Sequence, residues 1–157
     1  FMENGASHET AMQALRDRSR DNARSPMQWD SSKYAGFSNV EPWMPVNGNH
    51  TGINVETESK KEDSVLKTYQ WLLRLRKEQA LAHGELKFHA LKDPQLFMYE
   101  TSGDVHDYLV VANFKKPKTA FTFERLEDYT LIATNMETVN DSTTLEAYEA
   151  RIYRKDK

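Results

Sequence analysis

The stretch best suited to chemistry covers residues 19–30 and reads SRDNARSPMQWD. It places Arg20 and Arg24 four residues apart, among Asp, Asn and Ser. A guanidinium group is a planar, permanently charged fork that can hold a carboxylate while donating to neighbouring sugar hydroxyls. The same spacing suits a charged helix end, in which Asp17 and Asp21 pair with arginines one turn away. Spacing alone leaves both interpretations open, a salt-bridged helix end and a ligand-binding loop.

Aromatic side chains follow this stretch at Trp29, Tyr34, Phe37 and Trp43. Large rings of this kind supply apolar contact area with a polar handle on Tyr and Trp. They are suited to line a saccharide cleft, and they are equally suited to anchor a loop in a core. The sequence favours neither role over the other.

Other catalytic patterns are weak in this chain. Hydrolysis needs a nucleophile with a base in reach, or two carboxylates facing one another. The pairs Glu56/Glu58 and Asp104/Asp107 are interpreted as solvated turn residues, because surface carboxylates are usually that. The histidines do not show metal-ligand spacing and no glycine-rich phosphate loop is present, so we expect neither a metal nor a cofactor.

The composition of the chain limits the classes of partner that we expect it to bind. The chain has 157 residues, 38% of them hydrophobic, and a formal net charge of -3, which predicts a folded protein without a strong field for nucleic acid or an anionic membrane. It has no cysteine and no apolar run of the roughly 20 residues that a membrane helix needs. We expect a cytoplasmic location, although the lack of cysteine permits others. Since the chain opens on Phe, we also expect a piece of a longer polypeptide.

The first half of the chain is predicted to be helical around a long loop. Ser7 is a good N-cap for a helix over residues 7–18, with Glu9 in its first turn. Residues 31–59 are rich in Gly, Asn, Ser and Pro without a lasting period, which indicates a loop. Apolar residues then recur at helical spacing from a cap at Asp63 or Ser64 to a stop at Gly84.

The second half changes to short strands separated by turns. Runs of β-forming residues predict strands at 86–91, 95–101, 107–114, 120–124, 129–134 and 146–154. Regular turn signals without intervening helices indicate an antiparallel sheet or sandwich. The predicted fold class is therefore α+β.

The run SRDNARSPMQWD, followed by AGF, PWMPVN, INVE and the helix DSVLKTYQWLLRLRKE, resembles the C-terminal third of family 13 glycoside hydrolases. The resemblance is to the oligo-1,6-glucosidase type, which includes α-glucosidases and trehalose-6-phosphate hydrolases. It covers residues 11–153 and is strongest over 19–75. It implies that residues 1–83 are the end of a (β/α)8 barrel, with the loop after strand eight and helix eight. Residues 84–157 would then be a C-terminal antiparallel β sandwich domain.

The resemblance also implies an activity and two site residues. The family cleaves α-glucosidic bonds with retention, and its catalytic carboxylates lie upstream, where this chain has no matching position. Arg20 aligns with the arginine that reaches the nonreducing-end glucose and pairs with an upstream aspartate, and Arg24 aligns with a supporting arginine. Departures occur at Ser25, Tyr34 and His50, where Thr, Asn and Tyr are usual. The last two bear on loop conformation and substrate preference.

These implications predict the C-terminal part of a retaining α-glucosidase that acts on α-1,6, α-1,4 or trehalose 6-phosphate linkages. The chain alone is expected to be inactive, and its expected partners are an oligosaccharide and the remainder of the barrel. Two alternatives stay open: a noncatalytic relative that serves as a scaffold, and a carbohydrate-binding module built on the aromatic β domain. The sequence leaves the linkage preference undecided.

Overall fold

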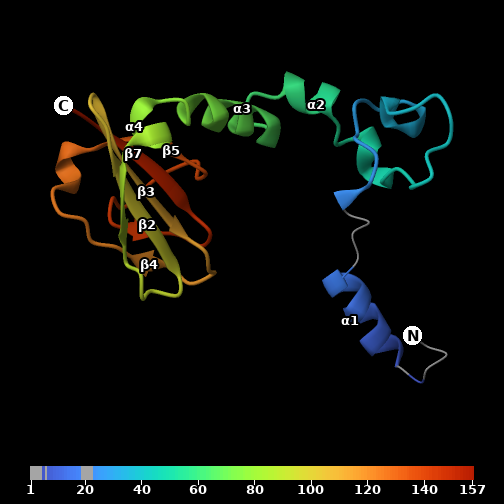
Figure 1. Ribbon diagram of the computed structural model, residues 1–157, viewed down its shortest axis with the longest axis horizontal. Coiled ribbons are helices and arrows are strands. Elements are labelled where there is room, and N and C mark those ends of the chain that lie inside the picture. Colours follow the sequence, from blue (N-terminus) through green and yellow to red (C-terminus); the bar gives the residue numbers. More distant parts are fainter. Residues whose placement is uncertain (1–4, 6, 19–22) are drawn as a thin grey trace. The chain divides into compact units, whose positions relative to one another are not determined.

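The computed structural model describes residues 5, 7–18 and 23–157, and the chain divides into two compact units, Phe1–Trp71 and Leu72–Lys157. We call them the N-terminal unit and the β unit, and Figure 1 shows the elements of each. The division falls inside one helix, ahead of the predicted domain boundary between residues 83 and 84. That boundary stays a prediction.

The first helix, α1, covers His8–Arg18 and confirms the prediction for this segment. Ser7 caps it as expected, because its hydroxyl accepts a hydrogen bond from the Thr10 amide at 3.1 Å and its carbonyl accepts one from the Ala11 amide at 3.0 Å. These bonds satisfy amides that lack a partner within the helix. Residues 19–22, which include Arg20, lie outside the described residues.

The prediction of a structureless loop over residues 31–59 is wrong in part. This segment holds two 3₁₀ helices, η3 (Lys33–Gly36) and η4 (Gly48–Thr51), and the start of α2 (Val55–Lys60). Asparagine caps begin the last two: Asn47 accepts from the Asn49 amide, and Asn54 accepts from the Thr57 amide. Helices this short do not complete enough turns to show an apolar period, so periodicity did not reveal them.

The predicted single helix up to Gly84 is divided into α3 (Val65–Leu75) and α4 (Gln79–His83). Ser64 is the cap, since its hydroxyl accepts from the Lys67 amide at 3.2 Å. Helical bonding ends where the amides of Lys77 and Glu78 donate three residues back, to Arg74 and Leu75. Such bonds tighten the last turn of a helix. The apolar spacing continues across the break, and for that reason the sequence did not show it.

The β unit confirms the predicted antiparallel sheet (Figure 1). Its main sheet has the strand order β1-β2-β3-β7-β5, with bounds Glu85–His89, Leu96–Ser102, His106–Asn113, Ala150–Asp156 and Thr130–Thr134. A second, two-stranded sheet pairs β4 (Thr119–Ala120) with β6 (Thr144–Leu145). A 3₁₀ helix, η5 (Leu126–Asp128), precedes β5.

Two predicted strands are wrong in extent. Of the run 120–124, only Ala120 lies in a strand, β4 (Thr119–Ala120); Phe121 is buried in the core, and Arg125 just beyond the run adopts a left-handed φ of 58°. The run 146–154 is interrupted before β7, where Tyr148 has a φ of 57°. Left-handed backbone ends a strand, and non-glycine residues adopt it only where their surroundings hold it.

The core of the β unit lies on one face of the main sheet. It consists of seven buried residues, Leu96, Met98, Leu109, Val111, Phe121, Leu145 and Tyr153. In β2 the core residues alternate with Phe97 and Tyr99, which point to the opposite, outer face. The two faces thus have different neighbours: one carries the packed core, and the other carries exposed rings such as Phe97 beside buried positions such as Thr101, which contacts α4.

One buried ion pair closes the loop between β5 and β7. The side chains of Arg151 and Glu149 are each 1% exposed, and Arg151 Nε donates to Glu149 Oε1 at 2.6 Å. The two terminal nitrogens of Arg151 donate to the carbonyls of Asp141, Ser142 and Thr144 at 2.6–3.0 Å. A single guanidinium therefore fixes the loop to the strand.

Helix α4 is bonded to the hairpin formed by β2 and β3. The buried hydroxyl of Thr101 donates to the Ala80 carbonyl at 2.6 Å, and the Asp104 amide donates to Gln79 Oε1 at 3.0 Å. Gly103 permits this approach, because a Cβ there would lie 2.3 Å from Gln79 Oε1. Among the residues described, no helix is long and apolar enough to cross a membrane.

Candidate functional site

The predicted site residues are only partly described. Arg20 lies outside the described residues, so its pairing and its role stay predictions. Arg24 is exposed and forms no ion pair with a described residue. Pro26, two residues further on, is buried, so the chain enters the following loop from a fixed point.

A tight turn follows at Trp29 and Asp30. Both of their amides donate to the Ala35 carbonyl, at 2.9 and 3.3 Å. The Asp30 carboxylate accepts from the hydroxyl and the amide of Ser32, at 2.5 and 2.9 Å. These hydrogen bonds hold the pKa of Asp30 below its ordinary value, so the group is ionised at neutral pH. Asp30 thus organises the turn as an acceptor.

Three consecutive residues of η3 have left-handed backbone: Tyr34, Ala35 and Gly36, with φ values of 58°, 56° and 64°. Ala35 is fully buried there, and each non-glycine residue in this region costs about 1 kcal/mol or more. Gly36 is required for a second reason, because a Cβ would lie 2.5 Å from the Asp30 carboxylate. The turn therefore depends on a close approach between Asp30 and Gly36.

We expect Gly36→Ala to open this turn, because the added methyl meets the Asp30 carboxylate in a strained conformation. The local cost is about 1–3 kcal/mol, which should speed hydrogen exchange at the Trp29 and Asp30 amides by about tenfold or more. Gly48→Ala is the matched control, since a Cβ at Gly48 meets nothing within 4 Å. Unchanged exchange at Trp29 in Gly36→Ala would contradict the prediction.

The turn is also bonded to the start of α2. The amides of Val55 and Glu56 donate to the carbonyls of Gln28 and Trp29, each at 2.9 Å, and the Gln28 side chain donates to the Ile53 carbonyl. Asn54, which is buried, accepts from the Thr57 amide at 2.8 Å and donates to the His50 carbonyl at 2.7 Å. Residues 28–30 are therefore held from both sides.

This anchored loop presents the predicted aromatic residues with their rings accessible. Trp29 and Phe37 are half exposed, Trp43 is 81% exposed, and the Lys33 ammonium lies 4.7 Å from the centre of the Tyr34 ring. Exposed rings of this kind are an arrangement that can stack on a ligand. Arg20 lies outside the described residues, so its position relative to these rings stays a prediction.

Three of the carboxylates predicted as solvated turn residues lie in a helix or a strand. Glu56 and Glu58 lie on α2, where they pair with Lys60 and Lys61 at 2.6 and 2.8 Å. Asp107 is buried on β3, 3.1 Å from the Lys157 ammonium, so its assignment to a solvated turn is wrong. Within the described part of the chain, no group of three or more His, Asp or Glu residues is placed to hold a metal ion.

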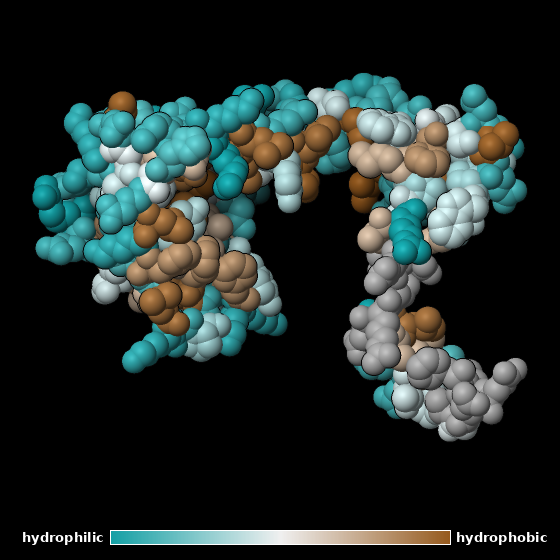
Figure 2. Space-filling view, viewed as in Figure 1, coloured by the Kyte–Doolittle hydropathy of each residue, from teal (hydrophilic) through white to brown (hydrophobic). Residues whose placement is uncertain are grey.

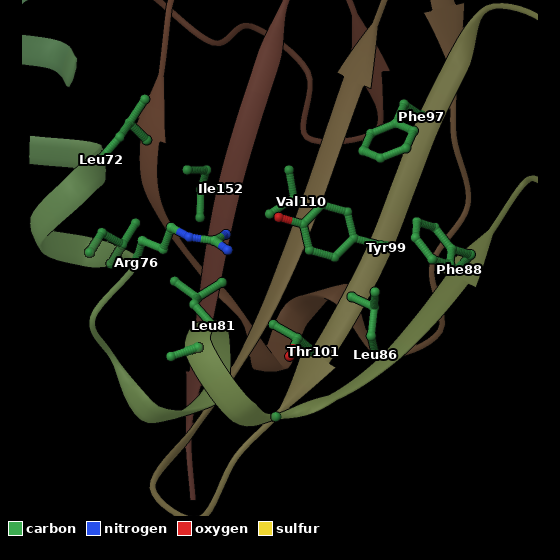
Figure 3. A pocket seen from close by; sticks show the side chains of 13 residues that line it. Leu72, Arg76, Leu81, Leu86, Phe88, Phe97, Tyr99, Thr101, Val110 and Ile152 are labelled. Carbon is green, nitrogen blue, oxygen red and sulfur yellow. The ribbon is translucent and has the colours of Figure 1, made fainter.

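The β unit carries a groove of about 570 Å³ on the outer face of its main sheet. Figure 3 shows Leu72, Arg76 and Leu81 on one side of it and strand residues such as Tyr99 and Ile152 on the other. Phe88, Phe97, Tyr99 and Phe114 form a chain of ring contacts along this face, at 5.7–6.1 Å between centroids. Burial raises the pKa of Tyr99, although the charge of Arg76 opposes it. The groove is suited to an apolar partner.

Several residues that build the candidate loop were not found from the sequence. Asn54 had a usable signal, because an Asn followed by Glu56 and Thr57 is a typical helix start. Asp30 followed by Ser32 fits a short side-chain turn, which is a weaker signal. The left-handed Ala35 gave none, since alanine has no preference for that conformation.

Comparison with known proteins identifies a family and several proteins that are similar to this chain. Residues 1–84, more than half of the chain, match the family model described as "Alpha amylase, catalytic domain". An oligo-1,6-glucosidase of Halalkalibacterium halodurans is 41% identical over 95% of this chain and 28% of its own length. A trehalose-6-phosphate hydrolase of Bacillus subtilis is 33% identical over 100% of this chain and 29% of its own length.

Solved structures agree with this result. The trehalose-6-phosphate hydrolase of Bacillus licheniformis superimposes with a TM-score of 0.86 at 29% identity, covering 99% of this chain and 30% of that one. An isomaltulose synthase from Klebsiella gives a TM-score of 0.82 at 28% identity, covering 98% and 29%. The chain therefore spans less than a third of the length of the proteins it matches.

Proposed function

Because this chain belongs to the alpha-amylase family, family 13 of the glycoside hydrolases, we propose that it forms the C-terminal part of a longer α-glucosidase. The observation that supports this most is the similarity to oligo-1,6-glucosidases across nearly the whole chain, although it covers only 28% of such a relative. Most of each relative has no counterpart here, so the activity belongs to a longer polypeptide.

The proposed reaction is release of terminal α-linked glucose from short oligosaccharides or from trehalose 6-phosphate, with retention of configuration. Retention needs two carboxylates about 5–5.5 Å apart, one as nucleophile and one as acid/base. Our proposal assigns both to the part of the protein outside this chain. Arg20 would donate to the nonreducing-end glucose, and Arg24 would support it, since guanidinium groups hold carboxylates and hydroxyls together.

The test compares this chain with the longer polypeptide encoded by the same open reading frame. We expect the longer protein to hydrolyse an aryl α-glucoside and at least one of isomaltose, maltose and trehalose 6-phosphate, with the α-anomer released first by NMR. We expect no turnover by the 157-residue chain. A longer protein that carries the barrel but lacks paired carboxylates and activity would support the noncatalytic alternative. Turnover by the purified chain alone would overturn the assignment.

We also propose that the remainder of the barrel covers the apolar surface that this chain exposes. Figure 2 shows apolar side chains at the surface along α3 and on the β unit. Large hydrophobic residues exposed on these segments include, with their exposed fractions, Val65 at 72%, Tyr69 at 63%, Leu73 at 59%, Phe88 at 46% and Phe97 at 42%. Large contiguous apolar patches are rare on monomers and mark surfaces that another protein part covers.

Without that cover, the isolated chain is expected to self-associate with rising concentration, because association removes apolar surface from water. Light scattering should show a mass that grows with concentration, and the double variant Leu73→Lys/Phe97→Lys should shift the onset to about tenfold higher concentration. Val40→Lys, at an exposed loop position, is the control and should leave association unchanged. A monomer at all concentrations would contradict the prediction.

A further inference from the structure

A second cavity of the β unit, of about 490 Å³, has a polar lining. It opens beside β1 and β2 at one end of the core face and is bounded by the segment from Thr122 to Tyr129. Its volume lies within the roughly 300–1,000 Å³ of small-molecule sites. The sequence did not reveal it, because its residues come from three strands and a loop that only the fold brings together.

One carboxylate in this cavity is held in place by its neighbours. Glu100 Oε1 accepts from the Tyr129 hydroxyl at 2.9 Å, and Glu100 Oε2 lies 3.6 Å from His89 Nε2. Burial, together with the bond to Glu100, raises the pKa of Tyr129 above its ordinary value, so the phenol stays protonated and keeps donating. Because Glu100 lies on a central part of the sheet, it is an acceptor fixed before any ligand arrives.

A ring is fixed beside this carboxylate. Phe123 makes edge-to-face contacts with His89 at 5.4 Å and with Tyr129 at 5.5 Å between centroids. These contacts hold Phe123 from two sides, and the ring is only partly buried. The cavity thus combines a positioned acceptor with an apolar surface.

The charges around the cavity nearly cancel. The lining includes the basic residues Lys87, Arg125 and Lys155 and the acidic residues Glu100 and Glu124. The Asp128 carboxylate, outside the lining, lies 2.5 Å from Arg125 and 3.5 Å from Lys155. A small anion would meet two carboxylates, and a cation would meet three basic groups. An apolar ligand would leave these groups without water or partners. A hydroxyl group both donates and accepts, so it matches donors and acceptors that alternate around one space.

We propose that this cavity binds a neutral mono- or disaccharide. The hydroxyls accept from Lys87 and donate to Glu100, and one face of a sugar ring packs against Phe123. Lys87 is available for this role because it forms no ion pair with a described residue. The ligand class follows from the cavity, whereas the choice of α-glucosides as its sugars rests on the proposed function.

Isothermal titration calorimetry of the 157-residue chain with isomaltose, maltose, cellobiose and inorganic phosphate tests the proposal. We expect isomaltose and maltose to bind with Kd values of about 1–10 mM. Glu100→Gln keeps an acceptor for Tyr129 but loses the charge, and it should weaken binding about tenfold. Phe123→Leu should weaken it similarly. Glu137→Gln, an exposed position outside the cavity, is the matched control and should bind as the parent does.

Circular dichroism of each variant confirms that a loss of binding reflects the site and not the fold. The proposal is overturned if none of the sugars binds at about ten times the expected Kd, if Glu100→Gln and Phe123→Leu both bind as the parent does, or if phosphate binds more tightly than the sugars. Binding of cellobiose alone would support a sugar cavity and contradict its link to α-glucosides. Sugar binding by a chain whose longer form lacks hydrolase activity would support the cavity and contradict the proposed function.

Discussion

Replacing Arg151 with methionine is expected to lower the free energy of unfolding of the β unit by about 3–5 kcal/mol. Methionine keeps much of the side-chain volume, so the loss comes from charge and hydrogen bonds. The change leaves the Glu149 carboxylate buried without its cation and removes the Arg151 donor from the carbonyls of Asp141, Ser142 and Thr144. Ser142 keeps the bond from the Tyr153 hydroxyl. An unpaired buried charge and unsatisfied carbonyls are among the most costly defects in a folded protein.

Urea unfolding followed by circular dichroism measures this loss. Arg154→Met is the control, because Arg154 is 41% exposed and its pair with Asp156 lies at the surface, where such pairs contribute about 0–1 kcal/mol. The double variant Arg151→Met/Glu149→Met should be less destabilised than Arg151→Met, since it removes the stranded charge. A loss below about 1 kcal/mol in Arg151→Met would contradict the role assigned to this pair.

The same pair predicts how stability depends on pH. Burial opposes ionisation of Glu149, but hydrogen bonds from Arg151 and from the Glu146 amide outweigh it and hold the pKa of this carboxyl below its ordinary value of 4.5. A lowered folded pKa stabilises the protein above the ordinary pKa and loses that effect as pH falls through the folded value. The parent chain should therefore lose stability below about pH 4.5, whereas the deficit of Arg151→Met should narrow there as its unpaired Glu149 takes a proton.

Replacing Arg20 with alanine in the longer protein is expected to lower kcat/KM for an aryl α-glucoside by about 100–1,000-fold. On the proposed function, Arg20 pairs with an upstream aspartate and donates to the terminal glucose. Its loss removes charge-assisted bonds to the substrate and leaves the aspartate unpaired in the site. Arg20→Lys keeps the charge but loses the planar fork, so it should fall between alanine and the parent.

Alanine variants of Arg24 and Arg16 are the comparisons for Arg20→Ala. Arg24→Ala should lower kcat/KM about tenfold, in keeping with a supporting role, and Arg16→Ala should leave it unchanged because Arg16 is exposed on α1. Steady-state kinetics with thermal unfolding of each variant separates substrate contacts from stability. Equal activity in Arg20→Ala and Arg16→Ala would contradict the assignment of Arg20.

The sequence predicted best those elements whose signals are local and repeated. Ser7 was identified as a cap, Ser64 was one of the two residues proposed for the next cap, and the run of β-forming residues at 95–101 predicted β2 to within one residue. The β5–β7 loop was not predictable in this way. Its geometry depends on Arg151, a residue type that is mostly exposed, and only the fold shows that this side chain is buried among the carbonyls of the preceding loop.

The candidate loop likewise has features that the sequence predicted and features that it did not. Its aromatic residues and Arg24 were singled out by type and spacing, and the resemblance implied a role for Arg24, which stays a prediction. The contact between Asp30 and Gly36 and the bond from Gln28 to Ile53 arise only when the chain folds back. Alanine rarely adopts a left-handed backbone. At Ala35 the hydrogen bond from the Trp29 amide to the Ala35 carbonyl decides that conformation.

The place of β7 in the sheet affects how the protein is made. β7 comes last of the strands along the chain, yet it lies between β3 and β5 and pairs with both. As the polypeptide leaves the ribosome, the β1–β2 and β2–β3 hairpins can form, but β5 lacks a neighbour until Ala150–Asp156 emerges. The sheet therefore closes only after β7 has emerged, and Arg151 arrives on that same strand to fix the loop made just before it.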